Sequence, residues 1–148
     1  MTDVREDQTQ IGEVLVRYAT GIDRRDWLRF RSCWTEDAEA DYGAVGRFSG
    51  VGAICDYMAR THEPLGDTLH RLSNIAIEVD GDTATGRTYI HAVLMVRKDD
   101  PTKWVDFLGY YDDDFVRTPD GWRIRRRTFH QSRMLRSQRQ TEPPQPRG

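Results

Sequence analysis

The sequence predicts an α+β domain in which a curved antiparallel sheet wraps around three N-terminal helices and encloses a ligand cavity. The length of 148 residues is that of a single domain with one core. Apolar residues recur at helical intervals only in the first 62 residues, and four long segments with strand character follow. Because helices and strands do not alternate along the chain, a doubly wound parallel sheet is excluded.

The first helix is predicted by a run of apolar residues at helical spacing. Its apolar face consists of Ile11, Val14, Leu15, Tyr18 and Ile22. Asp7 followed by Gln10 has the spacing of a capping box, and we expect the helix to end near Gly21. Residues 1–7 are therefore expected to be a flexible N-terminus.

Two further helices are predicted before the strands begin. A short one is expected from Asp26, with an apolar stripe of Trp27, Phe30 and Trp34, and a short extended stretch follows around Asp41 and Tyr42. The third helix begins at Val51, where Ile54, Cys55 and Met58 recur at helical intervals. It is expected to stop at His62-Glu63-Pro64, because proline disfavours helical backbone in the preceding residue.

The remaining chain is predicted to form an antiparallel meander. The expected strands are residues 68–79, 83–97, 104–117 and 122–134, joined by the turn Asp80-Gly81-Asp82, the loop DDPTK and the turn TPDG. The domain is expected to span residues 8–134. Residues 135–148 have too little apolar content to pack and are expected to form a mobile C-terminal tail.

Composition limits the class of protein. The chain is 37% hydrophobic, 31% charged and 10% aromatic, which is too aromatic for a disordered chain and too polar for a membrane span. The start MTDVREDQTQ does not resemble a secretory signal, so we expect a cytoplasmic protein without a membrane partner. Residues 123–148 carry eight arginines and one glutamate, but the remaining chain is strongly acidic. We therefore expect charge balance within the chain and no nucleic-acid partner.

Neither a metal nor an organic cofactor is predicted. The chain has no phosphate loop, GxGxxG, HExxH or GxSxG motif, and Cys33 and Cys55 do not have metal-knuckle spacing. Four polar residues lie on otherwise apolar elements and are candidates for chemistry: Tyr18, Asp23, Tyr42 and His70. Taken singly, each also has a structural interpretation. Asp23 fits a helix-end cap, His70 a core or surface histidine, and the tyrosines core aromatics.

Together these residues resemble a known family. The stretch RYATGIDRRDWLRFRSCWTEDAEADYG, then GVGAI, then a histidine before GDTATGRTYIHAVL and GYYDDDFVRTPDGWRI is similar to the SnoaL-like branch of the nuclear-transport-factor-two-like superfamily. The branch includes scytalone dehydratase, bile-acid dehydratase and lindane dehydrochlorinase. The resemblance covers residues 8 to about 134. It implies the cone-shaped α+β barrel, but this fold hosts many activities, so function depends on the site.

The resemblance implies a catalytic pair of Asp23 and His70, because lyases of the family have an aspartate ending the first helix and a histidine on the first long strand. It also implies catalytic roles for Tyr18 and Tyr42, and it places Arg126, four residues after the tryptophan of the last strand, as a pocket arginine. The predicted substrate-binding residues are Trp27, Ile90, Ala92, Leu94 and Tyr111.

The inward faces of two strands are open to alternatives. Alternation along residues 83–97 puts Ile90, Ala92 and Leu94 inward and His91 outward, but a one-residue register slip would reverse them. Relatives disagree about the inward face of residues 104–117, where we favour Tyr111. His91 and Asp113 are therefore second-rank candidates.

The resulting functional hypothesis is a cofactor-independent lyase of the dehydratase type that acts on a polycyclic or aromatic hydroxy-ketone such as a steroid or polyketide. Asp23 would fix the tautomer of His70, and His70 would abstract a proton next to a carbonyl. One alternative is a double-bond isomerase of the ketosteroid type. Another is a non-catalytic small-ligand binding or assembly subunit on the same fold. We also expect a homo-oligomer, a trimer before a dimer, because the face with Tyr89, His91 and Val93 carries large residues.

Overall fold

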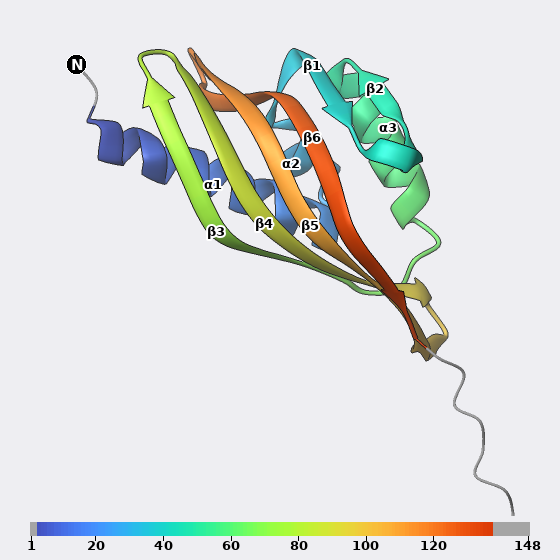
Figure 1. The fold of residues 1–148 in the computed structure, drawn as a ribbon. Coiled ribbons are helices and arrows are strands. Elements are labelled where there is room, and N and C mark those ends of the chain that lie inside the picture. The colour runs from blue at the N-terminus through green and yellow to red at the C-terminus, as the bar shows by residue number, and fades with distance from the viewer. Residues whose placement is uncertain (1–2, 138–148) are drawn as a thin grey trace, which may run out of the picture.

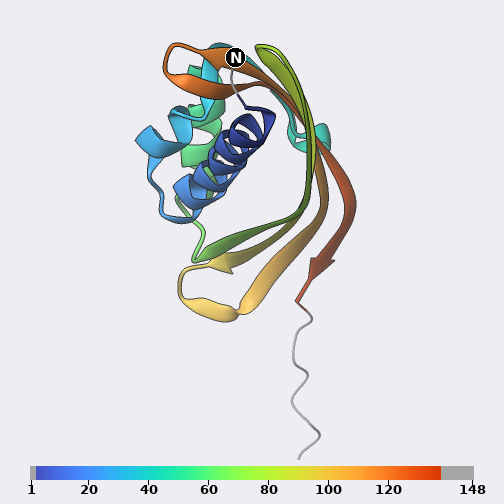
Figure 2. The same cartoon turned by 90° about the vertical axis from the view of Figure 1, so that its left-hand side faces the viewer.

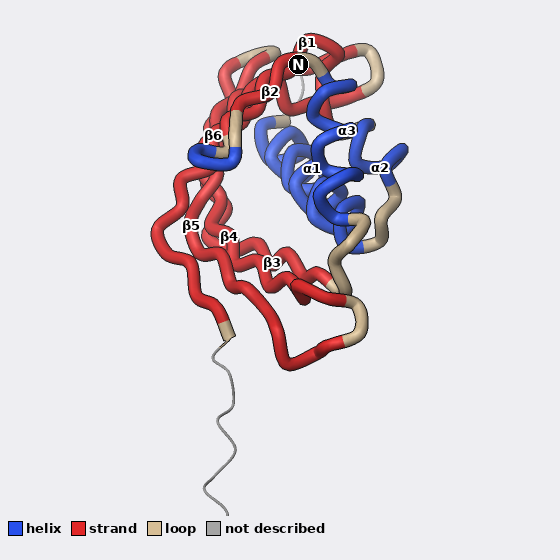
Figure 3. Tube along the Cα trace, turned by 90° about the vertical axis from the view of Figure 1, so that its right-hand side faces the viewer, coloured by secondary structure: helices blue, strands red, loops and turns tan. Residues whose placement is uncertain are grey.

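A six-stranded sheet curves around helix α1 (Val4–Asp23) in the computed structural model, which describes residues 3–137 (Figures 1 and 2). Helices α2 (Trp27–Arg31) and α3 (Val51–His62) lie on the same, concave side of the sheet as α1, as Figure 3 shows. The predicted α+β cone with three N-terminal helices is confirmed. Among the described residues, no helix has the length and apolar character that crossing a membrane requires.

Helix α1 begins earlier than the sequence pattern predicts. The Asp3 side chain caps it by accepting a hydrogen bond from the backbone N–H of Arg5 at 3.0 Å. Asp7 is buried and accepts hydrogen bonds from Arg117 at 2.8 and 2.9 Å and from the indole N–H of Trp122 at 3.0 Å. Residues 4–7 are thus part of the helix and not of a flexible N-terminus, because a long-range polar network holds its first turn.

The long strands are β3 (Thr68–Asp80), β4 (Thr83–Arg97), β5 (Asp100–Thr118) and β6 (Gly121–Arg136). They form the predicted antiparallel meander, and the sheet order is β2-β1-β6-β5-β4-β3. Strand β6 continues to Arg136, so the predicted tail begins later than residue 135. Its residues 138–148 lie outside the described part of the chain.

Two elements between the helices extend the sheet beyond the prediction. Strand β1 (Trp34–Asp41) pairs in parallel with β6, and β2 (Arg47–Ser49) pairs antiparallel with β1. Trp34, expected on the stripe of the second helix, begins β1, because α2 has only five residues. Tyr42 directly follows β1 and starts a short 3₁₀ turn at Gly43–Val45.

Bulges between β5 and β6 shape the concave face. Asp114 pairs with Arg126 while Phe115 pairs with Ile124, so Arg125 is an extra residue in β6. Before this bulge Trp122 and Ile124 are buried, whereas beyond it the buried residue is Arg127. A second irregularity follows Leu108, where Gly109 lies so close to β6 that a Cβ there would overlap the carbonyl oxygen of His130.

Candidate active site

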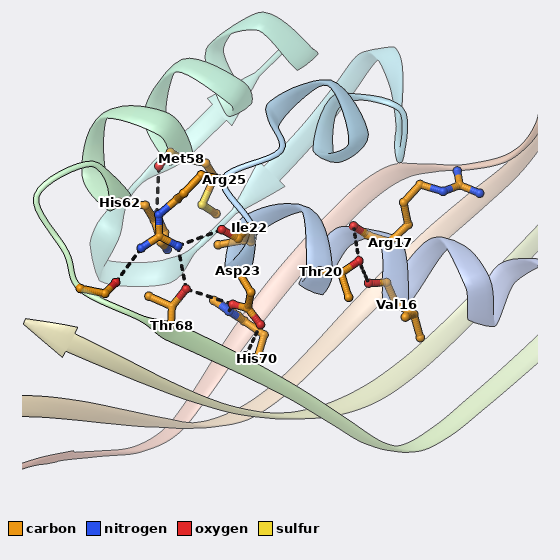
Figure 4. A network of polar contacts seen from close by, with 11 residues as sticks. Val16, Arg17, Thr20, Ile22, Asp23, Arg25, Met58, His62, Thr68 and His70 are labelled. Carbon is orange, nitrogen blue, oxygen red and sulfur yellow. Dashed lines mark hydrogen bonds and ion pairs between the residues drawn. The ribbon is translucent and has the colours of Figure 1, made fainter. Parts of the chain in front are cut away.

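Asp23 and His70 meet where the end of α1 approaches the first residues of β3 (Figure 4). The His70 Nδ1 atom lies 2.7 Å from one oxygen of Asp23, and the backbone N–H of His70 donates to the other oxygen at 2.9 Å. The Thr68 hydroxyl also donates to Asp23, at 3.0 Å. Because an ionised carboxylate only accepts hydrogen bonds, His70 Nδ1 carries the proton, and Nε2 of the neutral ring keeps its lone pair.

The surroundings of Asp23 favour its ionised form. Burial of the carboxyl tends to raise its pKa, but the hydrogen bonds from the His70 ring, the His70 backbone and Thr68 outweigh burial and lower the pKa. The side chain is 20% exposed, and that of His70 is 8% exposed. Asp23 is therefore a charged partner that orients the imidazole.

Arg25 ties the end of α1 to the beginning of β3. Its backbone has φ of +56°, and its guanidinium donates to the carbonyl oxygens of Ile22 at 2.9 Å and Gly66 at 2.8 Å. It also donates to the Thr68 hydroxyl at 2.8 Å, and this hydroxyl in turn donates to Asp23 (Figure 4). The network fixes the distance between the helix end and the strand that carries His70.

Three buried tyrosines form a second polar group. The hydroxyl groups of Tyr18 and Tyr42 are 2.8 Å apart, and the rings of Tyr18 and Tyr111 pack edge to face at 5.7 Å. Burial raises the pKa of Tyr18 and raises those of Tyr42 and Tyr111 well above the ordinary value for tyrosine. All three hydroxyls are thus protonated at neutral pH and can donate hydrogen bonds.

The arginine next to these tyrosines is Arg127, and the prediction of Arg126 is wrong. Arg126 is exposed on the convex face, where its Nε lies 3.4 Å from Glu39, because the bulge at Arg125 reverses the alternation of β6. Arg127 is fully buried, with its guanidinium 4.1 Å from the ring centre of Tyr18 and 3.8 Å from that of Tyr111.

Asp113, a second-rank candidate, is the counter-ion of Arg127. Both of its oxygens accept hydrogen bonds from that guanidinium at 2.7 Å, and neither side chain is exposed. Burial raises the pKa of Asp113. Burial also opposes the charge on Arg127, but the adjacent Asp113 reverses this and raises the arginine pKa well above its ordinary value. The Arg127 guanidinium packs on the rings of Tyr18 and Tyr111, and neither Arg127 nor Asp113 lines the cavity.

An apolar cavity of about 220 Å³ lies between α3 and the concave face of the sheet. His70, Tyr18, Tyr42 and Tyr111 line it, and so do the β4 residues that alternation placed inward, namely Ile90, Ala92 and Leu94. His91 lies on the other face, where its Nε2 is 3.6 Å from Asp106. No register slip has occurred.

Trp27 does not line this cavity. Its ring packs against Phe30 at 5.9 Å and His62 at 6.2 Å, and its other side borders a surface groove of about 810 Å³ that also reaches Asp23. This groove is larger than the cavity, but its lining is rich in charged side chains. The apolar cavity is the better candidate for a substrate site, because it holds the ring of His70 and the tyrosine hydroxyls.

The SnoaL-like domain family matches residues 3–128. The chain belongs to this family. Its SnoaL-like relative Rv2910c, an uncharacterized protein of Mycobacterium tuberculosis, is 38% identical over 123 residues, or 82% of each chain.

Solved structures of several other proteins share the fold. A protein of Novosphingobium aromaticivorans with the provisional name aromatic ring hydroxylase has a TM-score of 0.82 and 26% identity, over 91% of this chain and 96% of its own. The hexachlorocyclohexane dehydrochlorinase LinA of type 2 has a TM-score of 0.78 and 19% identity, over 93% of both chains. The two names describe different reactions, so the shared fold alone does not identify the reaction of this protein.

This SnoaL-like cavity also contains His62, which was expected only to end the third helix. Its ring lines the cavity, and the ring centres of His62 and His70 are 6.2 Å apart. A signal was present in the sequence, because His62 follows Met58 by four residues and so continues the buried stripe of α3. Within residues 3–137, no group of three or more His, Cys, Asp or Glu side chains is arranged to hold a metal.

Proposed function

We propose that this SnoaL-like protein is a cofactor-independent lyase of the dehydratase type that removes water from a hydrophobic hydroxy-ketone. The observation that carries the proposal is the His70 ring, which is held through Nδ1 by Asp23 at 2.7 Å and lines an apolar cavity. The same cavity contains the paired hydroxyls of Tyr18 and Tyr42. A base and a proton donor are thus available to one bound molecule.

In the proposed reaction His70 Nε2 takes the proton from the carbon next to the substrate carbonyl. The electron pair of the broken C–H bond forms the new carbon–carbon double bond, and the neighbouring C–O bond breaks. The Tyr18–Tyr42 pair donates a proton to the departing hydroxyl, which leaves as water, and the proton on His70 returns to the tyrosines through solvent. Asp23 stabilises the imidazolium formed in between.

The cavity favours a small substrate. Its volume of about 220 Å³ is below the roughly 300–1,000 Å³ typical of ligand pockets. We therefore propose an aromatic ketone with one or two rings in preference to a steroid. The name of the related dehydrochlorinase supports an elimination, since loss of hydrogen chloride and loss of water can both begin with removal of a proton from carbon.

The test is a screen of β-hydroxy-ketones with one to four rings, in which mass spectrometry detects loss of water and ultraviolet absorbance detects the new conjugated double bond. For the compound turned over, His70→Ala should lower kcat by about 10²–10⁴-fold with little change in affinity. Asp23→Asn should be nearly as damaging, because the amide does not stabilise the imidazolium. His130→Ala, which removes an exposed histidine on the convex face, is the matched control.

Three results would oppose the proposal. A folded His70→Ala variant with unchanged kcat would discard the mechanism. Movement of a double bond without loss of mass would replace the dehydratase with an isomerase that uses the same base. Tight binding of compounds that are never turned over, weakened equally by His70→Ala and Asp23→Asn, would favour a binding or assembly subunit, as the hydroxylase name of one related structure would allow.

We also propose that the protein is a homo-oligomer, a trimer before a dimer, in the cytoplasm. The convex face of the sheet exposes large side chains, among them Tyr89, Trp104 and Leu135. Such side chains are typical of surfaces that another subunit covers. Sedimentation that finds only monomer at micromolar concentration would rule out the oligomer.

A further inference from the structure

His62, a residue that lines the cavity, carries an unused hydrogen-bond acceptor. The residue is only 7% exposed, and its ring lines the cavity together with that of His70. No partner for its Nε2 atom is found within the described chain, although the atom is buried. Buried polar atoms are nearly always hydrogen-bonded, and an unpaired one destabilises the fold unless a bound molecule satisfies it.

The backbone of α3 determines which nitrogen of His62 is the acceptor. The Nδ1 atom lies 2.9 Å from the carbonyl oxygen of Met58 (Figure 4). A carbonyl oxygen only accepts, so Nδ1 carries the hydrogen and donates it. The Thr61 hydroxyl lies 3.2 Å from the same nitrogen. It donates its own hydrogen to the carbonyl oxygens of Tyr57 and Met58 within α3, so it does not donate to His62. In the neutral ring Nε2 is therefore a bare lone pair.

The neighbourhood also keeps His62 neutral. Burial lowers its pKa to about 4, and the nearby His70 and Arg25 act in the same direction, against the opposing effects of the Met58 carbonyl and Asp23. A base this weak is poorly suited to take a proton from carbon at neutral pH. His62 is thus suited to receive a hydrogen bond and not to abstract a proton from carbon.

We propose that His62 Nε2 accepts a hydrogen bond from a hydroxyl group of the substrate, so that the protein selects hydroxyl-bearing aromatic ketones over the same ketones without that hydroxyl. This inference rests on the proposed function, because it concerns the same cavity. It narrows the proposed class of substrates to molecules with a second hydroxyl group, which is remote from the hydroxyl that leaves as water. Sites that hold a buried acceptor for a substrate hydroxyl discriminate strongly against the analogue that lacks it.

The test uses 1-tetralone and its isomers with one hydroxyl on the aromatic ring, which need not react. Calorimetric titration should show at least one hydroxy isomer binding wild-type protein about 5–150-fold more tightly than 1-tetralone. The isomer whose hydroxyl is bonded internally to its own ketone is the ligand control and should show no gain. In His62→Phe, which keeps a flat ring but lacks the acceptor, the preference should fall below about twofold.

A spectroscopic readout covers the case in which His62→Phe does not fold. In wild-type protein labelled with ¹⁵N-histidine, the preferred isomer should shift the Nε2 resonance of His62 in the direction of an accepted hydrogen bond, and 1-tetralone should not. Equal affinity of all compounds, no binding by any hydroxy isomer, or a preference that survives in His62→Phe would overturn the inference. The binding test does not require turnover. If the protein prefers hydroxy-tetralones over 1-tetralone but dehydrates no compound in the screen, only the proposed function is refuted and the role of His62 stands.

Discussion

Replacing Asp113 with alanine would leave the guanidinium of Arg127 buried without its counter-ion. Both side chains have no exposed surface, and two hydrogen bonds of 2.7 Å join them. Removing one partner of such a pair costs about 3–5 kcal/mol, because the remaining charge stays desolvated. For a domain of this size 1 kcal/mol corresponds to roughly 2–4 °C, so the melting temperature should fall by about 6–20 °C.

Urea unfolding and thermal melting of the purified variant measure this loss directly. Arg126→Ala is the matched control, since the neighbouring arginine is 62% exposed and makes only a 3.4 Å contact with Glu39. Its effect should stay within about 0.5 kcal/mol. Replacing both members of the buried pair together, as Asp113→Leu with Arg127→Met, should recover much of the loss. A melting temperature within about 2 °C of wild type for Asp113→Ala would refute this account of the pair.

Three further outcomes follow from the polar groups around the cavity. Since burial lowers the pKa of His62 from its ordinary 6.5 to about 4, the unfolded chain binds the extra proton between these values. Stability should therefore decline as the pH falls through this window, and less so in His62→Phe. The pKa of Asp23 is lowered, so its contribution is present above the ordinary carboxyl value of about 3.9 and lost at lower pH, a loss that Asp23→Asn should abolish in urea titrations. Tyr18→Phe and Tyr42→Phe should each lower the free energy of unfolding by about 1–3 kcal/mol, because each leaves the other hydroxyl without its partner. Chemical denaturation of the double variant should show a loss smaller than the sum of the two single losses.

Local periodicity was sufficient to predict most of the fold, whereas the central contact of the site was implied by the resemblance to the SnoaL-like family. The apolar spacing of α1 places Asp23 at its end, the alternation of β4 places Ile90 and Ala92 inward, and the expected hydrogen bond between Asp23 and His70 is present. These features depend on elements that keep one period throughout their length.

The errors occur where long-range contacts interrupt that period. The bulge at Arg125 exchanges the faces of Arg126 and Arg127, and no pattern in a run of arginines marks the extra residue. Strand β1 was underestimated because its pairing is parallel to β6, about ninety residues away in sequence. Residues 4–7 are helical because Asp7 is fixed by Arg117 and Trp122, partners that come from the last two strands.

The hydrogen bond from the His70 backbone to Asp23 also affects how the sheet meets other molecules. Strand β3 is the last strand of the six-stranded sheet, so within residues 3–137 no strand pairs with its outer side. Free N–H groups on such an edge are a template for strands of other chains, and a charged side chain is a common way to block it. By accepting the His70 N–H at 2.9 Å, the Asp23 carboxylate occupies one of these positions. The aspartate proposed to orient the base therefore also blocks one backbone N–H on the edge of the sheet from pairing with another chain. Substitutions that remove the carboxylate are expected to free this N–H for aggregation as well as to weaken the contact with the His70 ring.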